Sequence, residues 1–302
     1  MRIAVPDLIS NSYFPAIAAV ELGFLRDEGI DANIDLLFPV DEAYRALARG
    51  QVDIVAGSAH SALAAFPEWR GVKLLCAQSH GMYWFLVMRA DLEAQRGDVS
   101  ALRGKKIGAA PWVDLGLKQL IVDAGMGLDE VEVAPVPGAA GTGTNFGLTA
   151  AQALAEARID GFWANGMGAE VAVRSGAGTV VLDARRGDGP PQAFDYTFAS
   201  LAATDEFISA DRSRSQAVVR ALSRAHVLLA DNPDRATAVG ERIFPPEQAT
   251  LIADLVRRDA PFYSATITDR SIEGLNRFTF ARGLTSRTAP YEQVVATELE
   301  RS

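Results

Sequence analysis

Apolar positions along this chain follow two spacings, one typical of strands and the other typical of helices. The run 52–55 is short and apolar, as in a buried strand. Leu117, Leu120, Ile121 and Ala124 instead recur at i, i+3, i+4 and i+7, which is the spacing of an amphipathic helix. Strands and helices alternate along most of the chain, and this predicts an α/β fold with mostly parallel sheets flanked by helices.

Three landmarks occur twice and in the same order. ALARGQVDIVAGS is matched by ALAEARIDGFWANG, with Asp53 and Asp160 in the same place. A helix end followed by a strand near Gly29 is matched near Gly127, and RIAVP at the start is matched by KKIGAAP. An internal repeat of this kind predicts two similar lobes. Because both aspartates hold the same position, we expect them to orient turns.

The repeat also sets the expected domain boundaries. Lobe 1 is predicted to contain residues 1–87 and 199–302, and lobe 2 residues 88–198. Two hinge strands are expected to join them, one within 83–92 and the other within 194–204. The chain after the return strand has helical apolar faces interrupted by prolines, so a helical C-terminal segment is predicted.

Composition narrows the class of partner. The formal net charge of −9 disfavours nucleic acid and anionic membrane surfaces as general partners. A small anion remains compatible, because helix N-termini favour negative charge locally. Cys76 is the only cysteine, so we expect a buried thiol with no internal disulfide and no cysteine metal cluster. No apolar run approaches the roughly 18 residues of a membrane-spanning helix, so no stable membrane insertion is expected.

Several segments resemble a known family. FPAIAAVELGFLRDEGID, ALARGQVDIVAGS, LRGKKIGAAP and SIEGLNRFTFARGLTSRTAPYEQV are similar to the type 2 periplasmic solute-binding proteins. The resemblance is to the branch with the sulfonate, taurine and nitrate binders and the NMT1/THI5-like proteins, and it covers nearly the whole chain. It implies two lobes, joined by two strands, that close over a small molecule.

The chain departs from that family in three places. AAPWVDLG stands where the family usually has a small polar turn that binds phosphate or sulfonate, and GAAGTGTNFGLT is unusually rich in glycine. The cysteine-rich motif of the THI5-like pyrimidine synthases is absent, so pyrimidine-synthase activity is not expected.

Candidate ligand contacts lie where strands lead into helices, since ligands of open α/β sheets bind beyond the carboxyl ends of the strands. Three of the four tryptophans and two of the three histidines fall in these loops. We expect an interlobe site with free N–H groups at helix starts after Ser12, Ser58 and Trp112 facing an anion. The predicted ligand-binding residues are Asn11, Ser12, Tyr13, Ser58, His60, His80, Trp84, Trp112, Trp163, Asn165 and Tyr196.

The three histidines are predicted to differ in role. His60 and His80 lie in loops, where a histidine can contact an anionic ligand, shape the turn or transfer a proton. His226 lies one turn after Leu222 on a helical apolar face, so it is expected in the core. No histidine has metal-ligand spacing with cysteine or acidic residues, and GTGTNFG is not a dinucleotide fingerprint, so neither metal nor cofactor is expected.

Two functions remain open from sequence. The first is a solute-binding protein of an ABC-type importer, which binds a small organic anion by hinge closure and passes it to a permease. An aromatic or heterocyclic anion is one form of this prediction. The alternative is a cytosolic enzyme on the same fold, such as a decarboxylase, a dehydratase or an enzyme of cofactor-precursor biosynthesis, with His60 and His80 as catalytic candidates. The expected location is the periplasm if a signal peptide preceded Met1, and the cytoplasm if Met1 is the native start.

Overall fold

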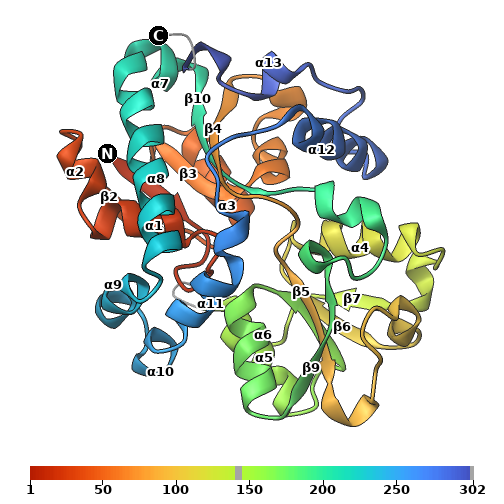
Figure 1. Cartoon of the computed structure of the whole chain (residues 1–302). Helices are drawn as coiled ribbons and strands as arrows, with labels where there is room; N and C mark the ends of the chain where they lie inside the picture. Colours follow the sequence, from red (N-terminus) through yellow and green to blue (C-terminus); the bar gives the residue numbers. More distant parts are fainter. Residues whose placement is uncertain (140–144, 300–302) are drawn as a thin grey trace. The chain divides into compact units, whose positions relative to one another are not determined.

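The chain passes from a first folding unit to a second and then returns. In the computed structural model, which describes residues 1–139 and 145–299, unit 1 contains residues 1–80 and 197–302, and unit 2 contains residues 81–196 (Figure 1). Each unit has its own sheet and its own helices.

The sheet of unit 1 has five strands in the order β2-β1-β3-β10-β4. β1 is parallel to β2 and to β3, whereas β10 is antiparallel to both of its neighbours, β3 and β4. Four strands therefore run in one direction and only β10 runs in the other. The strands are β1 (Arg2–Val5), β2 (Asn33–Leu36), β3 (Ile54–Ser58), β4 (Val72–Ser79) and β10 (Ala199–Thr204).

The sheet of unit 2 repeats this plan in the order β7-β6-β8-β5-β9. β6 is parallel to β7 and β8, and β5 is antiparallel to β8 and β9. The strands are β5 (Phe85–Arg89), β6 (Lys106–Ala109), β7 (Glu132–Ala134), β8 (Gly161–Ala164) and β9 (Gly178–Asp183). The predicted α/β class with two mostly parallel sheets is confirmed.

The two strands predicted to cross between lobes are the two antiparallel strands. β5 is the first strand after the chain enters unit 2, and β10 is the first after it returns to unit 1. Because β5 pairs entirely within the second sheet, the first boundary falls after residue 80 rather than after 87. The second falls after residue 196 rather than after 198.

Most helices of unit 1 come from the C-terminal part of the chain, so the predicted helical segment is confirmed. α8 turns Ala221, Leu222, Ala225 and Leu229 inward, and it packs against α1 and β4. The helices are α1 (Phe14–Glu21), α2 (Phe24–Asp27), α3 (Val40–Ala48), α7 (Asp205–Ala210), α8 (Arg212–Asp231), α9 (Arg235–Ile243), α10 (Pro246–Ala249), α11 (Ile252–Asp259), α12 (Asp269–Ala281) and α13 (Tyr291–Val294). Short 3₁₀ segments are η1 (Ala59–Ala64), η2 (Pro67–Trp69), η8 (Ala260–Phe262) and η9 (Thr297–Leu299).

Unit 2 has three α-helices, α4 (Asp114–Asp123), α5 (Phe146–Ala155) and α6 (Gly166–Arg174), within its described residues. Its 3₁₀ segments are η3 (Ala90–Leu92), η4 (Val99–Leu102), η5 (Leu128–Glu130), η6 (Ala184–Arg186) and η7 (Pro191–Asp195). The connection from β6 to β7 moves one way along the sheet and that from β7 to β8 moves back. Right-handed crossovers therefore place α4 and α5 on opposite faces. In the described part of the chain, no helix is long and apolar enough to cross a membrane.

The two predicted turn aspartates have the same structural role. The carboxylate of Asp53 accepts the backbone N–H of Arg2 at 2.7 Å, and that of Asp160 accepts the backbone N–H of Lys106 at 2.9 Å. Asp53 thus ties the start of β3 to the start of its parallel neighbour β1, and Asp160 ties the start of β8 to that of β6. The internal repeat is a structural repeat, in which the two aspartates make the same strand-to-strand hydrogen bond.

The glycine that ends a helix in each unit was expected near Gly29 and Gly127, and the structure differs for the second. Gly29 ends a helix with φ of 78°, and its counterpart in unit 2 is Gly125, with φ of 79°, rather than Gly127. Gly50, with φ of 66°, corresponds to Ala157, which adopts a φ of 54° without being glycine. The left-handed region costs an L-residue about 1–2 kcal/mol. The two units therefore share this backbone turn even though Ala157 disfavours its conformation.

Candidate functional site

The four parallel strands of unit 1 end at one edge of its sheet, and this edge also receives the start of β10. Ser58 is the last residue of β3, and His80 directly follows β4. The loop before α1 reaches the same edge, because the Ala16 N–H donates to the side chain of Gln78 near the end of β4, at 3.3 Å. Six predicted residues are thereby brought together: Asn11, Ser12, Tyr13, Ser58, His60 and His80.

Ser58 and His60 are fully buried within a network of polar contacts. The Ser58 hydroxyl lies 2.6 Å from that of Ser61, and the carbonyl of Ser58 accepts the hydroxyl of Tyr44 at 2.9 Å. Nδ1 of His60 lies 3.0 Å from Oγ1 of Thr197, and its ring packs edge-on against Phe278 with centroids 5.3 Å apart. The ring of His60 therefore contacts the returning chain at Thr197.

The other two histidines lie beside β4. His80 is half-buried and its N–H donates to the carbonyl of Phe262 at 2.8 Å. His226 is buried, as predicted, and its Nε2 lies 2.8 Å from the carbonyl of Gln78. Burial, together with the neighbouring His80, lowers the pKa of His226 to about 4, although the hydrogen bond to Gln78 opposes the shift. His226 is therefore neutral at physiological pH.

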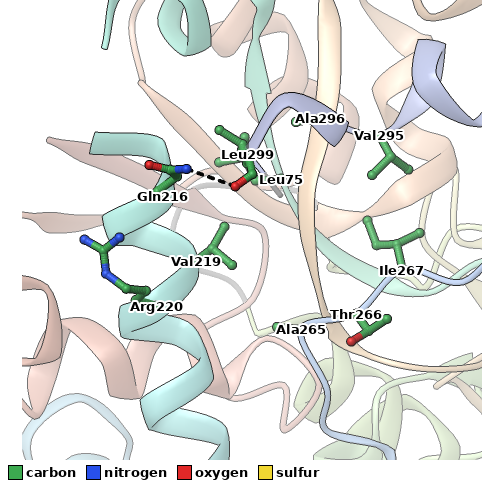
Figure 2. A pocket seen from close by; sticks show the side chains of 10 residues that line it. All are labelled: Leu75, Gln216, Val219, Arg220, Ala265, Thr266, Ile267, Val295, Ala296 and Leu299. Carbon is green, nitrogen blue, oxygen red and sulfur yellow. Dashed lines mark hydrogen bonds between the residues drawn. The ribbon is translucent and has the colours of Figure 1, made fainter. Parts of the chain in front are cut away.

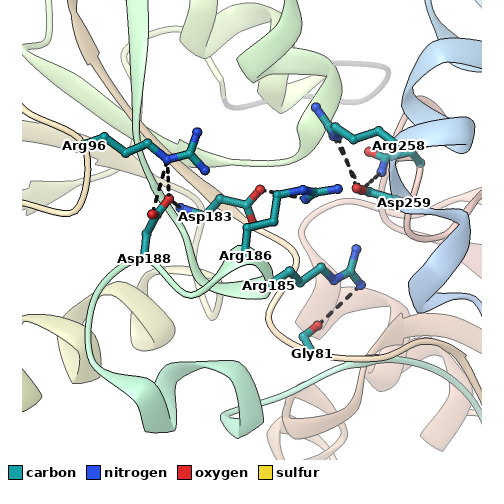
Figure 3. Close-up of polar contacts among 9 residues, drawn as sticks. Gly81, Arg96, Asp183, Arg185, Arg186, Asp188, Arg258 and Asp259 are labelled. Atoms are coloured by element: carbon teal, nitrogen blue, oxygen red, sulfur yellow. Dashed lines mark hydrogen bonds and ion pairs between the residues drawn. The ribbon is translucent and has the colours of Figure 1, made fainter.

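The loop before α1 is fixed by the C-terminal helices. The side-chain N–H of Asn11 donates to the carboxylate of Asp259, and the Tyr263 hydroxyl donates to the Asn11 carbonyl at 2.5 Å. Asp259 also accepts from Arg258 at 3.1 Å (Figure 3). Ser10 and Asn11 are each 1% exposed, yet Ser10 Oγ and Asn11 Oδ1 have no hydrogen-bond partner in the described part of the chain.

Aromatic rings gather at the corresponding edge of unit 2. The rings of Tyr83 and Trp84 lie 4.7 Å apart, and those of Trp84 and Trp163 lie 6.4 Å apart in an edge-on arrangement. We call these three residues the aromatic row. A Cβ built on Gly116 of α4 would touch the Trp84 ring, so Trp84 faces α4. Nε1 of Trp163 is buried and has no partner among the described residues.

A buried cation borders the aromatic row. The guanidinium of Arg185 lies 5.6 Å from the Tyr83 ring centroid, and its Nη2 lies 3.4 Å from the carbonyl of Gly81 (Figure 3). Arg185 is only 6% exposed. The next residue, Arg186, forms an ion pair with Asp183 at 2.7 Å. Arg185 thus brings a permanent positive charge to this edge.

The other predicted residues of unit 2 have different positions. Trp112 is half-buried and starts the turn into α4 with a φ of 70°. Asn165 caps α6, since its Oδ1 accepts the Gly168 N–H at 2.9 Å. The Tyr196 hydroxyl bonds to Asp123 at the C-terminal end of α4, the opposite end from Trp112, so it does not join the aromatic row. Burial and then Asp123 raise the pKa of Tyr196.

The chain after Ser58 and after Trp112 was expected to begin helices whose free N–H groups face an anion, and the structure differs at both places. The chain after Ser58 forms the 3₁₀ segment η1 rather than an α-helix. In α4, the N–H groups of Asp114, Leu115 and Gly116 already donate to carbonyls of the preceding turn. The backbone N–H groups of these three residues are therefore already paired. Of the glycine-rich segment 138–149, residues 140–144 lie outside the described residues.

A separate cavity of about 460 Å³ lies beside β4 and α8 in unit 1 (Figure 2). Its lining is mostly apolar, and its amide side chain, Gln216, donates to the Leu299 carbonyl at 3.0 Å. None of the predicted ligand-binding residues lines it. Since none of its lining residues is a buried charged residue or has a buried unpaired polar atom, the carboxyl edges are the better candidates.

Sequence reasoning missed Arg185, Ser10 and Asp259. Arg185 could have been found, because the segment 184–186 directly follows β9, the fourth parallel strand of unit 2, and so reaches the same edge as the other loops. Ser10 lay within a loop that was already identified. Asp259 gave no local signal, since its contact with Asn11 joins positions 248 residues apart. Among the described residues, no group of three or more His, Cys, Asp or Glu is placed to hold a metal ion.

Solved structures of other proteins have a similar architecture. Three similar structures are a ligand-binding component of an ABC-type import system from Staphylococcus aureus with zinc bound, the periplasmic aliphatic sulphonate binding protein SsuA from Escherichia coli and the desulfurization enzyme DSZB. Their TM-scores are 0.74, 0.73 and 0.68 at 13%, 12% and 14% identity. The matches cover 100%, 100% and 99% of this chain and 98%, 99% and 97% of those chains. No curated protein matches the sequence.

Two mixed five-stranded sheets, each with one inserted antiparallel strand, define the type 2 periplasmic binding protein-like fold, which is the fold of solute-binding components of ABC importers. The NMT1/THI5-like family model matches residues 10–236. The chain belongs to the NMT1/THI5-like family, and the resemblance seen in the sequence is confirmed.

Proposed function

We propose that this protein is the solute-binding component of an ABC-type importer and that its solute is a small organic anion with a flat body. The observation that carries the proposal is the buried guanidinium of Arg185 beside the aromatic row of unit 2. Membership of the family and the likeness of fold to the S. aureus import component and to SsuA support the role in import.

The chemistry of this edge favours an anion. Arginine is always charged in proteins and only donates hydrogen bonds, and the indole N–H of Trp163 is also only a donor. Two donors, one of them charged, match the oxygens of a carboxylate or sulfonate. Tyr83, Trp84 and Trp163 add flat apolar surface, which suits an aromatic or heterocyclic body. The role in import implies a periplasmic location and a permease as partner.

The proposal is tested by binding measurements on Arg185→Gln. We expect calorimetry to detect binding of benzoate or benzenesulfonate to the wild type and to show a roughly 10- to 150-fold weaker affinity in the variant. This is the cost of a lost hydrogen bond to a charged group. The matched control is Arg96→Gln, which removes an exposed arginine paired with Asp188 and should leave the affinity unchanged.

Neutral sugars and cationic amines are the compounds whose binding would contradict an anionic solute. A thermal-shift screen that finds stabilisation only by these compounds contradicts the anion. Equal affinity in wild type and Arg185→Gln contradicts the position of the site.

An enzyme on the same fold is the second candidate, and the likeness to the desulfurization enzyme DSZB favours keeping it in the experiment. His60 and His80 would then be the candidates for proton transfer. Mass spectrometry of the anions after incubation with the protein decides between the two. Conversion that is lost in His80→Ala supports the enzyme, and recovery of unchanged ligand supports the binding protein.

A further inference from the structure

Gly81 is the first residue of unit 2, and two features of its surroundings favour glycine. Its φ is 72°, in the left-handed region that residues with a side chain disfavour. A Cβ built on it would lie 2.6 Å from the ring of Phe194, a distance at which one of the two must move. The backbone here both turns left-handed and lies directly against a ring, and glycine is the residue that permits both.

The carbonyl of Gly81 accepts a hydrogen bond from the arginine of the candidate anion site. Nη2 of Arg185 lies 3.4 Å from this carbonyl, as Figure 3 shows, and the same guanidinium lies 5.6 Å from the Tyr83 ring centroid. The direction of a carbonyl follows from the φ and ψ angles of its residue, so the left-handed turn determines where this acceptor points. Arg185 is thereby held between the backbone of Gly81 and the ring of Tyr83.

Phe194 holds the segment 81–82 in two ways. Its carbonyl accepts the Met82 N–H at 2.9 Å, and its ring lies against Gly81. Tyr83 and Trp84 of the aromatic row follow directly in the chain. The position of this short segment therefore decides both where Arg185 finds its carbonyl acceptor and where the aromatic row begins. All of these residues belong to unit 2.

We propose that Gly81 and Phe194 are positioning residues of the anion site, which hold the guanidinium of Arg185 beside the aromatic row. This inference rests on the proposed function and deepens it, because it says how the charge is kept in place before a solute binds. A long arginine side chain loses conformational freedom when a ligand orders it. A guanidinium that the Gly81 carbonyl has already oriented binds an anion with less of that loss.

Anions and their neutral counterparts of similar shape measure the positioning of Arg185. The probes are benzoate with benzamide, and benzenesulfonate with benzenesulfonamide. We expect calorimetry to show that the wild type prefers the anion of at least one pair by roughly 10-fold or more, the value of a hydrogen bond to a charged group. This preference is the quantity to compare between variants, because a general loss of stability weakens the binding of both members of a pair.

Gly81→Ala is the first variant, since its added methyl group displaces the Phe194 ring and disfavours the left-handed turn. We expect the preference for the anion to fall by roughly 5-fold or more, through partial loss of a charged hydrogen bond. The matched control is Gly125→Ala, also in unit 2, where φ is 79° and an added Cβ would meet nothing within 4 Å among the described residues beyond its chain neighbours. This control has the same backbone penalty and should keep the preference.

Two further proteins show whether Gly81 acts through Arg185. Phe194→Ala removes the ring without adding strain at Gly81, so it tests the same contact should Gly81→Ala fail to fold, and its preference for the anion should also fall. In the Arg185→Gln background, Gly81→Ala should change the preference no further, since the group that it positions is gone.

The outcomes separate this inference from the proposed function. A preference that is lost in Arg185→Gln but kept in both Gly81→Ala and Phe194→Ala overturns the positioning and leaves the anion-binding function standing. A further fall caused by Gly81→Ala within the Arg185→Gln background also overturns it, because Gly81 would then act on another group. A wild type that binds no anion, or that binds both members of each pair equally, contradicts the proposed function and the positioning with it.

Discussion

His226 is the residue whose burial has the clearest consequence for stability. Its Nε2 bonds to the Gln78 carbonyl, its Nδ1 has no partner among the described residues, and its ring lies 5.7 Å from that of Tyr263. A second proton on Nδ1 would place a buried charge with no acceptor, which explains the low pKa of this histidine.

This pKa predicts how stability depends on pH. The folded-state pKa of about 4 lies below the value of about 6.5 in the unfolded chain, so between these values the unfolded state binds more protons. Stability should therefore fall as the pH is lowered from about 6.5 to 4, by as much as about 3 kcal/mol from this group. His226→Gln should reduce that acid slope in urea unfolding measured at several pH values.

His80→Gln provides the comparison, because His80 is only half-buried. An acid slope in His226→Gln equal to that of the wild type would show that His226 is not the titrating group.

Single residues were predictable from sequence where a local pattern decided their environment. The helical face around Leu222 correctly predicted that His226 is buried. The loops after strands identified Trp84 and Trp163, which meet in the structure. The enclosure of His60 was not predictable, because Thr197 and Phe278, which contact its ring, come from distant parts of the chain.

At the scale of elements, the repeat allows the stability contribution of the same hydrogen bond to be compared in the two units. Asp53→Ala and Asp160→Ala each remove the carboxylate that accepts the first backbone N–H of a central strand. We expect each to lower the free energy of unfolding by about 1–2 kcal/mol, because both carboxylates are partly exposed and water can replace part of the bond. Urea unfolding monitored by circular dichroism measures this.

The asparagine variants at the same two positions test whether the lost hydrogen bond causes the loss of stability. Asn retains an acceptor oxygen, so Asp53→Asn and Asp160→Asn should recover part of the lost stability. Equal losses in the alanine and asparagine variants would contradict a hydrogen-bonding role.

Strand order was predictable to the extent that the repeat revealed it. β-α-β alternation predicted the parallel strands, and the strands expected within 83–92 and 194–204 are β5 and β10. The sequence does not show that β10 inserts between β3 and β4, because that pairing depends on partners more than 100 residues away, such as Leu201 with Ala56 and Cys76. Nor did it predict that the chain after Ser58 winds as a 3₁₀ segment, whose first N–H groups donate to Phe198 and Thr197.

At the scale of the whole molecule, the register of β4 and β10 predicts that unit 1 folds without unit 2. Ser79 pairs with Ala199, so the chain leaves and re-enters unit 1 at adjacent positions. Paired residues on antiparallel strands lie about 5 Å apart, a distance that a short turn can span. Replacing residues 81–196 with Asn-Gly should give a protein with one cooperative urea transition.

A longer deletion supplies the control. Extending it through Thr204 removes β10, the strand of the sheet that pairs with β4, and cooperative unfolding should be lost. The segment 81–196 expressed alone contains every strand of its own sheet and should also unfold cooperatively. A shorter protein without a cooperative transition would contradict the independence of unit 1.

The insertion of β10 between β3 and β4 also fixes an order of events during synthesis. β4 leaves the ribosome early, but its partner in the sheet is made only after the 116 residues of unit 2. Unit 2 is continuous in sequence, so it can complete its sheet while the first unit is still missing a strand. Until then β4 has an unpaired edge, which is the kind of edge that other chains can join. The nascent protein is therefore most in need of a chaperone between the synthesis of β4 and that of β10.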